Sequence, residues 1–101
     1  MRSDSMSWDF GRIAPGEKVR HEFILKNDSG KVINVKDVTS SCGCTVSSIK
    51  KRTLNPQEEV VLDVQFDSTG YAGDIVQYVY VSTDSVKDPV FRFIVKANVV
   101  K

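Results

Sequence analysis

Hydrophobic and polar residues alternate along most of this chain, and this period of two restricts the fold more than any other feature of the sequence. The clearest run has Val60, Leu62, Val64 and Phe66 alternating with polar residues, with Val61 as the one apolar exception. Successive side chains of a strand point to opposite faces, so this pattern is typical of strands with one buried face. Helical spacing is not sustained anywhere in the sequence.

The same alternation predicts further strands, separated by turn residues such as Pro15-Gly16. The third of these strands loses its phase at Asp37 and Val38, which predicts a β-bulge. Residues 75–83 are apolar on both faces, which predicts a central strand covered on both sides. The expected strands are residues 8–13, 19–26, a strand that includes 33 and 35, 60–66, 75–83 and 91–99.

Regularly spaced turns without intervening helices predict an all-β fold, an immunoglobulin-like antiparallel β-sandwich of about seven strands. A small closed barrel is the alternative. The length of 101 residues fits a single domain spanning 1–101, large enough to bury a core without disulfides.

Composition narrows the class of protein. The chain is 41% hydrophobic and 27% charged, with a net charge of +1, which excludes a disordered chain and argues against a nucleic-acid binder. No stretch approaches the roughly 20 apolar residues of a membrane span.

We expect a monomer with an unspecified protein partner. We expect a periplasmic or cell-surface location if an export signal or lipid anchor outside this chain was removed, and a cytoplasmic one otherwise.

Both cysteines lie in one motif, Ser41-Cys42-Gly43-Cys44-Thr45, which is the candidate thiol site. In an extended strand, residues two apart are separated by roughly 6.6 Å, too far for a relaxed disulfide. A turn at Gly43 would allow a small, strained and easily reduced ring, suited to redox exchange. An extended segment would direct both thiolates to one side, where they could hold a Cu(I) ion.

A metal at this motif would take Cys42 and Cys44 as ligands, with the only histidine, His21, as a third. Zinc is less favoured, because structural zinc sites use four protein ligands. The simpler interpretation is that the two thiols pack as small hydrophobes beside a bulge, without a cofactor.

The remaining polar residues give little support for catalysis. His21 shares a strand face with Val19, Phe23 and Leu25, so it is expected to be a core or rim residue. No nucleophile elbow, phosphate-binding loop or metalloprotease motif is present, so we expect no enzyme activity. The cationic run 50–52 is typical of a solvated loop. Tyr71, Tyr78 and Tyr80 are expected to serve cross-strand packing, with an aromatic binding surface as the alternative.

A larger pattern of residues resembles the bacterial immunoglobulin-like family known as domain of unknown function 1573. The Ser-Cys-Gly-Cys-Thr core is the most specific part, and the match extends over nearly the whole chain. Three positions depart from the pattern, because Gln57 and Ala97 stand where glycine is frequent and Asp84 where asparagine is usual. The matching residues are Phe10, Gly11, Ile13, Pro15, Gly16, Glu17, His21, Phe23, Asn27, Ile33, Val35, Val38, Ser41, Cys42, Gly43, Cys44, Thr45, Pro56, Phe66, Gly70, Gly73, Thr83 and Pro89.

The resemblance implies a sandwich similar to the major sperm protein and cilia-associated immunoglobulin-like domains, often in exported or lipid-anchored bacterial proteins. It implies no activity. Two hypotheses follow: a non-catalytic interaction or scaffold module, which we favour because sandwich loops and edges can hold a partner, and a redox or Cu(I)-binding thiol site.

Overall fold

The alternating segments form strands in a computed structural model that describes residues 2–3, 6–41, 45–86 and 89–101. These residues contain nine strand segments. In chain order they are β1 (Arg2–Ser3), β2 (Ser7–Ile13), β3 (Lys18–Lys26), β4 (Ile33–Ser40), β5 (Thr45–Ile49), β6 (Thr53–Leu54), β7 (Glu59–Asp67), β8 (Gly73–Thr83) and β9 (Val90–Val99).

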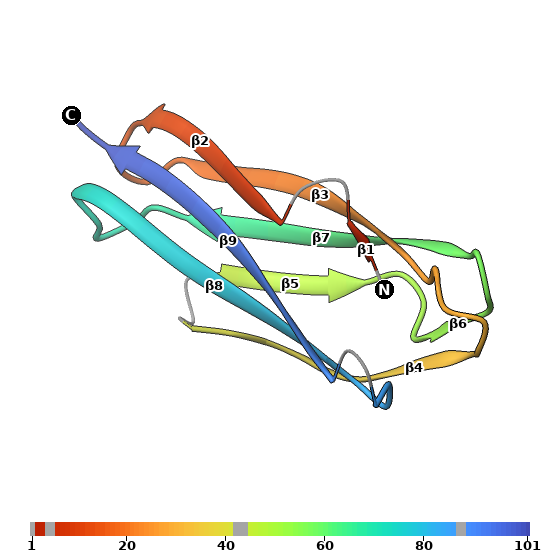
Figure 1. Cartoon of the computed structure of the whole chain (residues 1–101). Helices are drawn as coiled ribbons and strands as arrows, with labels where there is room; N and C mark the ends of the chain where they lie inside the picture. The colour runs from red at the N-terminus through yellow and green to blue at the C-terminus, as the bar shows by residue number, and fades with distance from the viewer. Residues whose placement is uncertain (1, 4–5, 42–44, 87–88) are drawn as a thin grey trace.

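The strands form two sheets packed face to face (Figure 1). One sheet has the order β1-β3-β7-β5 and the other the order β2-β9-β8-β4-β6. The predicted immunoglobulin-like sandwich is confirmed. One pairing differs from a fully antiparallel arrangement, since β2 runs parallel to β9. A parallel pair requires a long connection, and here nearly the whole chain lies between the two strands.

The core lies between the sheets and uses the inward face of each long strand. Leu62, Val64 and Phe66 of β7 are at most 2% exposed, and Phe93 and Val95 of β9 lie opposite them in the other sheet. β8 is central, as predicted, because it lies between β9 and β4. The prediction that both faces of β8 are covered is wrong, since Val76 is 45% exposed. In a two-layer sandwich each sheet has only one face against the core.

The predicted bulge in β4 is confirmed, because the pairing with β8 shifts register between Val35 and Asp37. Three strands, β1, β5 and β6, were not predicted from the sequence. β5 contains mostly Thr and Ser, which give no apolar alternation, and β1 and β6 have two residues each. These strands are defined by tertiary pairing more than by their own sequence.

Two turns with the same construction open β3 and β7. In each turn, a proline is followed by a residue with positive φ and then by a glutamate. The N–H of that glutamate donates to the carbonyl oxygen of the residue before the proline. These bonds run from Glu17 N to Ala14 O (3.1 Å) and from Glu58 N to Asn55 O (3.0 Å). Each glutamate carboxylate accepts the return bond, from Ala14 N (2.9 Å) and Asn55 N (2.9 Å). The positive-φ residue is Gly16 (φ 85°) in one turn and Gln57 (φ 69°) in the other.

Two fully buried polar residues, Asn27 and Ser68, end the same two strands. Asn27 N–H donates to Glu58 O (2.9 Å), and Ser68 N–H donates to Glu17 O (3.1 Å), so each strand end is bonded to the turn that opens the other strand. Residues 14–27 and 55–68 thus repeat one unit, and the two units pair antiparallel with each other.

The Asn27 side chain satisfies its full hydrogen-bonding capacity. Nδ2 donates to Lys31 O (2.8 Å) and Leu54 O (3.0 Å), while Oδ1 accepts from Ser29 N (3.0 Å) and Ser29 Oγ (2.7 Å). Through these bonds one residue fixes the β3–β4 turn and the start of the connection after β6.

We expect Gln57→Gly to raise the free energy of unfolding by about 1 kcal/mol, because the left-handed conformation costs a side-chain-bearing residue about 1–2 kcal/mol and glycine returns part of that gain through the freedom of the unfolded chain. Urea unfolding measures the change. The matched control is Gly16→Gln in the equivalent turn, which should lower stability. Equal changes of the same sign would contradict the assignment of strain to Gln57.

Asn27→Ala should lower the free energy of unfolding by about 1–3 kcal/mol, because it leaves the buried carbonyl oxygen of Leu54 without its side-chain donor, whereas the Lys31 carbonyl keeps the bond from Ser29 Oγ (3.0 Å). The control Ser29→Ala removes one hydroxyl at the same turn and should cost about 1 kcal/mol. Unfolding by urea, with an unchanged dependence on denaturant, checks both. If Asn27→Ala lowered the free energy of unfolding by less than Ser29→Ala does, Asn27 would not organise this end of the sandwich.

Candidate functional site

The cysteine motif lies in a connection between the two sheets. Cys42, Gly43 and Cys44 lie outside the described residues, and the flanking residues are Ser41 and Thr45. β4 ends at Ser40 in the five-stranded sheet, and β5 begins at Thr45 in the four-stranded sheet. The connection therefore crosses from one layer of the sandwich to the other.

Hydrogen bonds fix both ends of this connection. Ser40 Oγ donates to Thr45 O (2.9 Å), and Thr45 itself is only 3% exposed. Ser41 N–H donates to Tyr78 O (2.9 Å), and Ser41 Oγ accepts from Tyr78 N–H (3.0 Å) while donating to Gln77 Oε1 (2.8 Å). The thiol chemistry of Cys42 and Cys44, redox exchange or Cu(I) binding, stays a prediction.

His21 and Thr45 lie on different strands of the four-stranded sheet, on the two sides of β7. His21 pairs with Val64 of β7, whereas Thr45 pairs with Phe66 on the opposite side of that strand. The backbones of β3 and β5 are thus about 10 Å apart, two strand spacings. The role of His21 as a metal ligand stays a prediction.

Aromatic contacts hold the His21 ring. It stacks on Trp8 of β2 with ring centroids 4.1 Å apart and planes 7° from parallel, and it meets the edge of Phe23 at 4.6 Å. Burial lowers the pKa of His21 below its ordinary value of 6.5, although the carboxylate of Glu22 acts in the opposite direction. His21 is therefore a rim residue of the core that stays neutral near pH 7.

Charged side chains in the described residues form pairs with structural roles. Lys51 Nζ lies 2.6 Å from Glu58 Oε2, and this contact, with the bond from Asn55 N–H, lowers the pKa of Glu58. Arg52 donates to Lys36 O (3.2 Å). Two of the three cations in the 50–52 run therefore have protein partners. Among the described residues, no group of three or more His, Cys, Asp or Glu is placed to hold a metal ion.

A strip of apolar and aromatic side chains crosses the outer face of the five-stranded sheet. Tyr78 and Tyr80 of β8 stack with centroids 6.4 Å apart, and the Arg92 guanidinium of β9 lies 5.3 Å from the Tyr78 ring centre. Ile94 pairs with Tyr78 across the two strands. We call Val76, Tyr78, Tyr80, Arg92 and Ile94 the outer strip.

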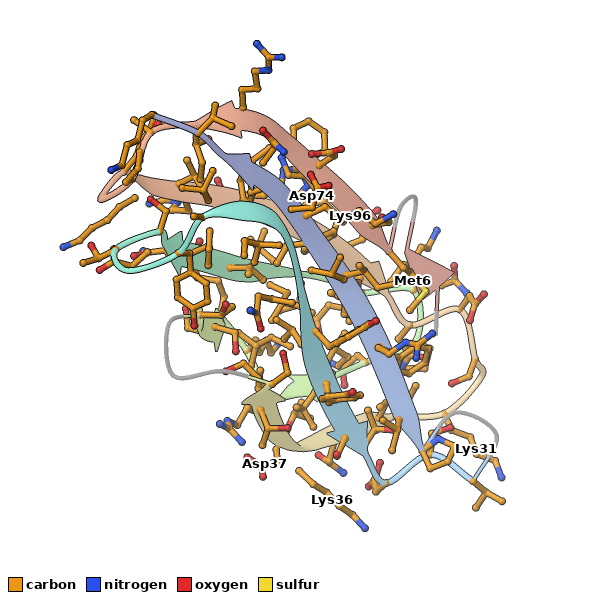
Figure 2. All side chains as sticks on the ribbon, turned by 90° about the vertical axis from the view of Figure 1, so that its left-hand side faces the viewer. Met6, Lys31, Lys36, Asp37, Asp74 and Lys96 are labelled. Carbon is orange, nitrogen blue, oxygen red and sulfur yellow. The ribbon has the colours of Figure 1, made fainter. Side chains whose placement is uncertain are left out.

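Figure 2 shows the molecule from a side on which β8 and β9 lie in front. Beside the outer strip, a hollow of about 370 Å³ lies between β2, β8 and β9. Two carboxylates and two cations line it, Asp9, Asp74, Arg12 and Lys96, so it favours neither sign of charge.

The three tyrosines differ in their surroundings, which the sequence predicted only in part. Tyr71 packs against Phe66 in the core, with centroids 5.6 Å apart, as the packing hypothesis predicts. Tyr78 and Tyr80 pack on each other and under Arg92 on the outer face of β8, where both are half-buried, and their role as a binding surface stays a prediction. The sequence feature that could have indicated this surface is the apolar second face of residues 75–83, which was predicted to be buried.

The two sheets with this strand order define an immunoglobulin-like β-sandwich domain. The chain belongs to the family described as protein of unknown function (DUF1573), whose model matches residues 1–99. The sequence-based resemblance is thereby confirmed. No curated protein matches the sequence.

Solved structures share the fold at low sequence identity. A protein of unknown function from Porphyromonas gingivalis W83 is 18% identical, with a TM-score of 0.83 over 94% of this chain and 44% of that one. The VesB protease of Vibrio cholerae is 15% identical, with a TM-score of 0.79 over 93% of this chain and 30% of that one. The ASH/PapD-like domain 7 of human CEP192 is 14% identical, with a TM-score of 0.75 over 99% of this chain and 84% of that one.

The chain thus spans less than half the length of the first two of these structures. In the described part of the chain, no helix is long and apolar enough to cross a membrane.

The His21 pKa predicts that stability falls as the pH decreases from about 7.5 to 5. The unfolded chain, with the ordinary pKa of 6.5, binds a proton before the folded chain does, so the stabilisation present above pH 6.5 is lost as the pH falls toward the lowered folded-state pKa. Urea unfolding across this range measures the loss. Emission of Trp8, the only tryptophan, should titrate below pH 6.5 because of the stacked ring.

His21→Gln is the control for this titration. It should flatten the dependence of stability on pH in this range, because the pKa values of Glu58, Asp67 and Asp84 are held below the ordinary carboxylate range and these groups titrate at lower pH. A Trp8 emission midpoint above 6.5 would contradict the burial of His21 as the dominant influence.

Proposed function

We propose that residues 1–101 form one immunoglobulin-like domain that acts as a non-catalytic interaction module and binds a protein partner through the outer strip. The outer strip carries the proposal, because it places aromatic, aliphatic and guanidinium groups on a sheet face that nothing in the described residues covers. Tyrosine and arginine are the residues that most often dominate protein interfaces.

The geometry of the outer strip supports this role. Stacking holds both tyrosine rings in place before binding, so little side-chain freedom is lost on association. The Arg92 guanidinium lies over the Tyr78 ring, and its N–H groups suit a partner that offers a carbonyl or carboxylate beside an apolar side chain. Val76 contributes an apolar surface that is 45% exposed.

Enzyme activity is not part of this proposal. VesB and VesC of Vibrio cholerae are proteases, but this chain covers only 30% and 21% of them, and a likeness at 15% and 12% identity shows the fold alone. The alternative of a thiol site at Cys42 and Cys44 has no further observation in its favour.

The test uses the chain as bait for proteins of the organism that encodes it, followed by calorimetric titration with the purified binding protein. A Tyr78→Thr, Tyr80→Thr double variant should weaken binding at least about tenfold, since removal of central aromatic contacts commonly costs more than 1 kcal/mol. Threonine keeps the β-propensity, so the fold should be retained.

The matched control is Val61→Thr on the outer face of the other sheet, which should leave the affinity unchanged. Retained affinity in the double variant would contradict the outer strip as the binding surface. Failure to capture any partner that titrates would contradict the interaction role itself.

A further inference from the structure

The lateral edges of the two sheets differ in how they meet solvent, and an open edge is a template for another strand. The β2 edge is interrupted, because its pairing with β9 shifts between Asp9 and Arg12 and the carboxylate of Asp9 accepts the Gly11 N–H (2.8 Å). These features prevent a regular ladder from forming along β2.

The β4 edge is occupied by one of its own side chains, by Arg52 and by the short strand β6. The carboxylate of Asp37 accepts the Val38 N–H (2.9 Å), Arg52 donates to Lys36 O (3.2 Å), and β6 pairs with Ile33 and Asn34. β5 is joined to the end of β4, since Ser40 Oγ donates to Thr45 O (2.9 Å).

The β3 edge is open along most of its length. All nine residues of β3 pair with β7 without a register shift. The main-chain hydrogen bonds of Glu17 and Asn27 are directed toward the β7 side. Along an antiparallel strand the main-chain groups of successive residues point to alternate sides. Those of Lys18, Arg20 and Glu22 therefore point away from β7. On that side, among the described residues, β1 meets only Leu25 and Lys26.

The side chains along this edge are complementary to themselves. Arg20 and Glu22 point to the outer face, with side chains 56% and 49% exposed, and they lie on either side of His21. If two β3 strands pair antiparallel about an axis through His21, Arg20 of each copy lies opposite Glu22 of the other. Lys18 then lies opposite Ile24, so no like charges meet.

Trp8 adds an apolar component next to the same axis. It is 42% exposed and stacks on His21, so pairing of two β3 edges would bring the Trp8 rings of both copies close to the new interface. The open length, residues 18–24, ends where β1 begins to pair with β3, so a partner strand of the same length fits the gap.

We propose that the β3 edge pairs with the β3 edge of a second copy, forming a two-fold dimer in which β5, β7 and β3 of both copies make one continuous sheet of six strands. Arg20 and Glu22 set its register. The monomer expected from the sequence would be replaced by a concentration-dependent dimer. This surface is separate from the outer strip, so failure of one does not imply failure of the other.

Sedimentation equilibrium of the full chain over a wide concentration range tests the dimer. The chain should associate, and Arg20→Glu and Glu22→Arg should each weaken association at least about tenfold by placing like charges opposite each other.

An equimolar mixture of these two variants should associate at least as well as the unchanged chain. In the mixed dimer, the glutamate introduced at position 20 of one variant lies opposite the arginine introduced at position 22 of the other. The unchanged Glu22 of the first variant then lies opposite the unchanged Arg20 of the second, so both pairs again have opposite charges.

Two controls keep the outcome unambiguous. Thermal unfolding shows whether each variant is folded, since Asp63 lies 3.3 Å from Arg20 and is affected by Arg20→Glu. If that variant does not fold, Glu22→Pro replaces it, because proline there removes an outward N–H of the edge strand, leaves the Arg20–Asp63 contact in place and should abolish association. The Tyr78→Thr, Tyr80→Thr variant should dimerise normally.

A chain that stays monomeric at the highest concentration overturns the proposal. So does a mixture of the charge variants that fails to recover association, or association lost in the Tyr78→Thr, Tyr80→Thr variant, which would place the contact on the outer strip. The proposal would also be overturned if a different protein bound along β3 and no second copy of this chain were displaced from that edge.

Discussion

The structure depends on how the β3–β7 pair satisfies its main-chain groups where the strands end inside the sandwich. Buried N–H and C=O groups without partners cost about as much as a lost hydrogen bond each, so both strand ends need internal donors and acceptors. Asn27 and Ser68 supply them, and each residue also bonds to the proline turn that opens the opposite strand. The pair is therefore closed at both ends by the same device.

The repetition of this device explains the only strained residue among those described. A turn of this geometry needs positive φ at the residue after proline, which glycine adopts without cost. The first turn has Gly16 there, and the second has Gln57. The departure of Gln57 from the family pattern is thus a local strain that the two-strand unit tolerates, and it leaves the strand order unchanged.

Much of the fold was predictable because the strands that carry the core have one apolar face. Residues 60–66 and 91–99 alternate so regularly that their inward faces follow from sequence. β5 was not predictable, because its position depends on pairing with β7 rather than on its own apolar residues. The apolar second face of β8 was misinterpreted as buried, since alternation shows which side chains are apolar and not how many layers the domain has.

The candidate site shows the same limit. The cysteine motif was identified as the most specific sequence feature, and the hydrogen bonds of Ser40, Ser41 and Thr45 now show that its flanks tie the two sheets together. The pairing of Trp8 with His21 was not predictable, because it joins strands of different sheets across a corner of the sandwich. Only the parallel pairing of β2 with β9 places Trp8 there.

The two proposed surfaces have a geometric consequence when they are considered together. The outer strip lies on the five-stranded sheet, whereas the β3 edge belongs to the four-stranded sheet, so a dimer through β3 would leave both outer strips uncovered. Such a dimer would present two copies of the outer strip to one partner assembly. A weak single contact would then gain affinity through effective concentration, provided that the spacing of the partner's sites matches the dimer. A modest strip on a small domain would suffice for stable binding to a repetitive partner, while a partner with one site would bind weakly.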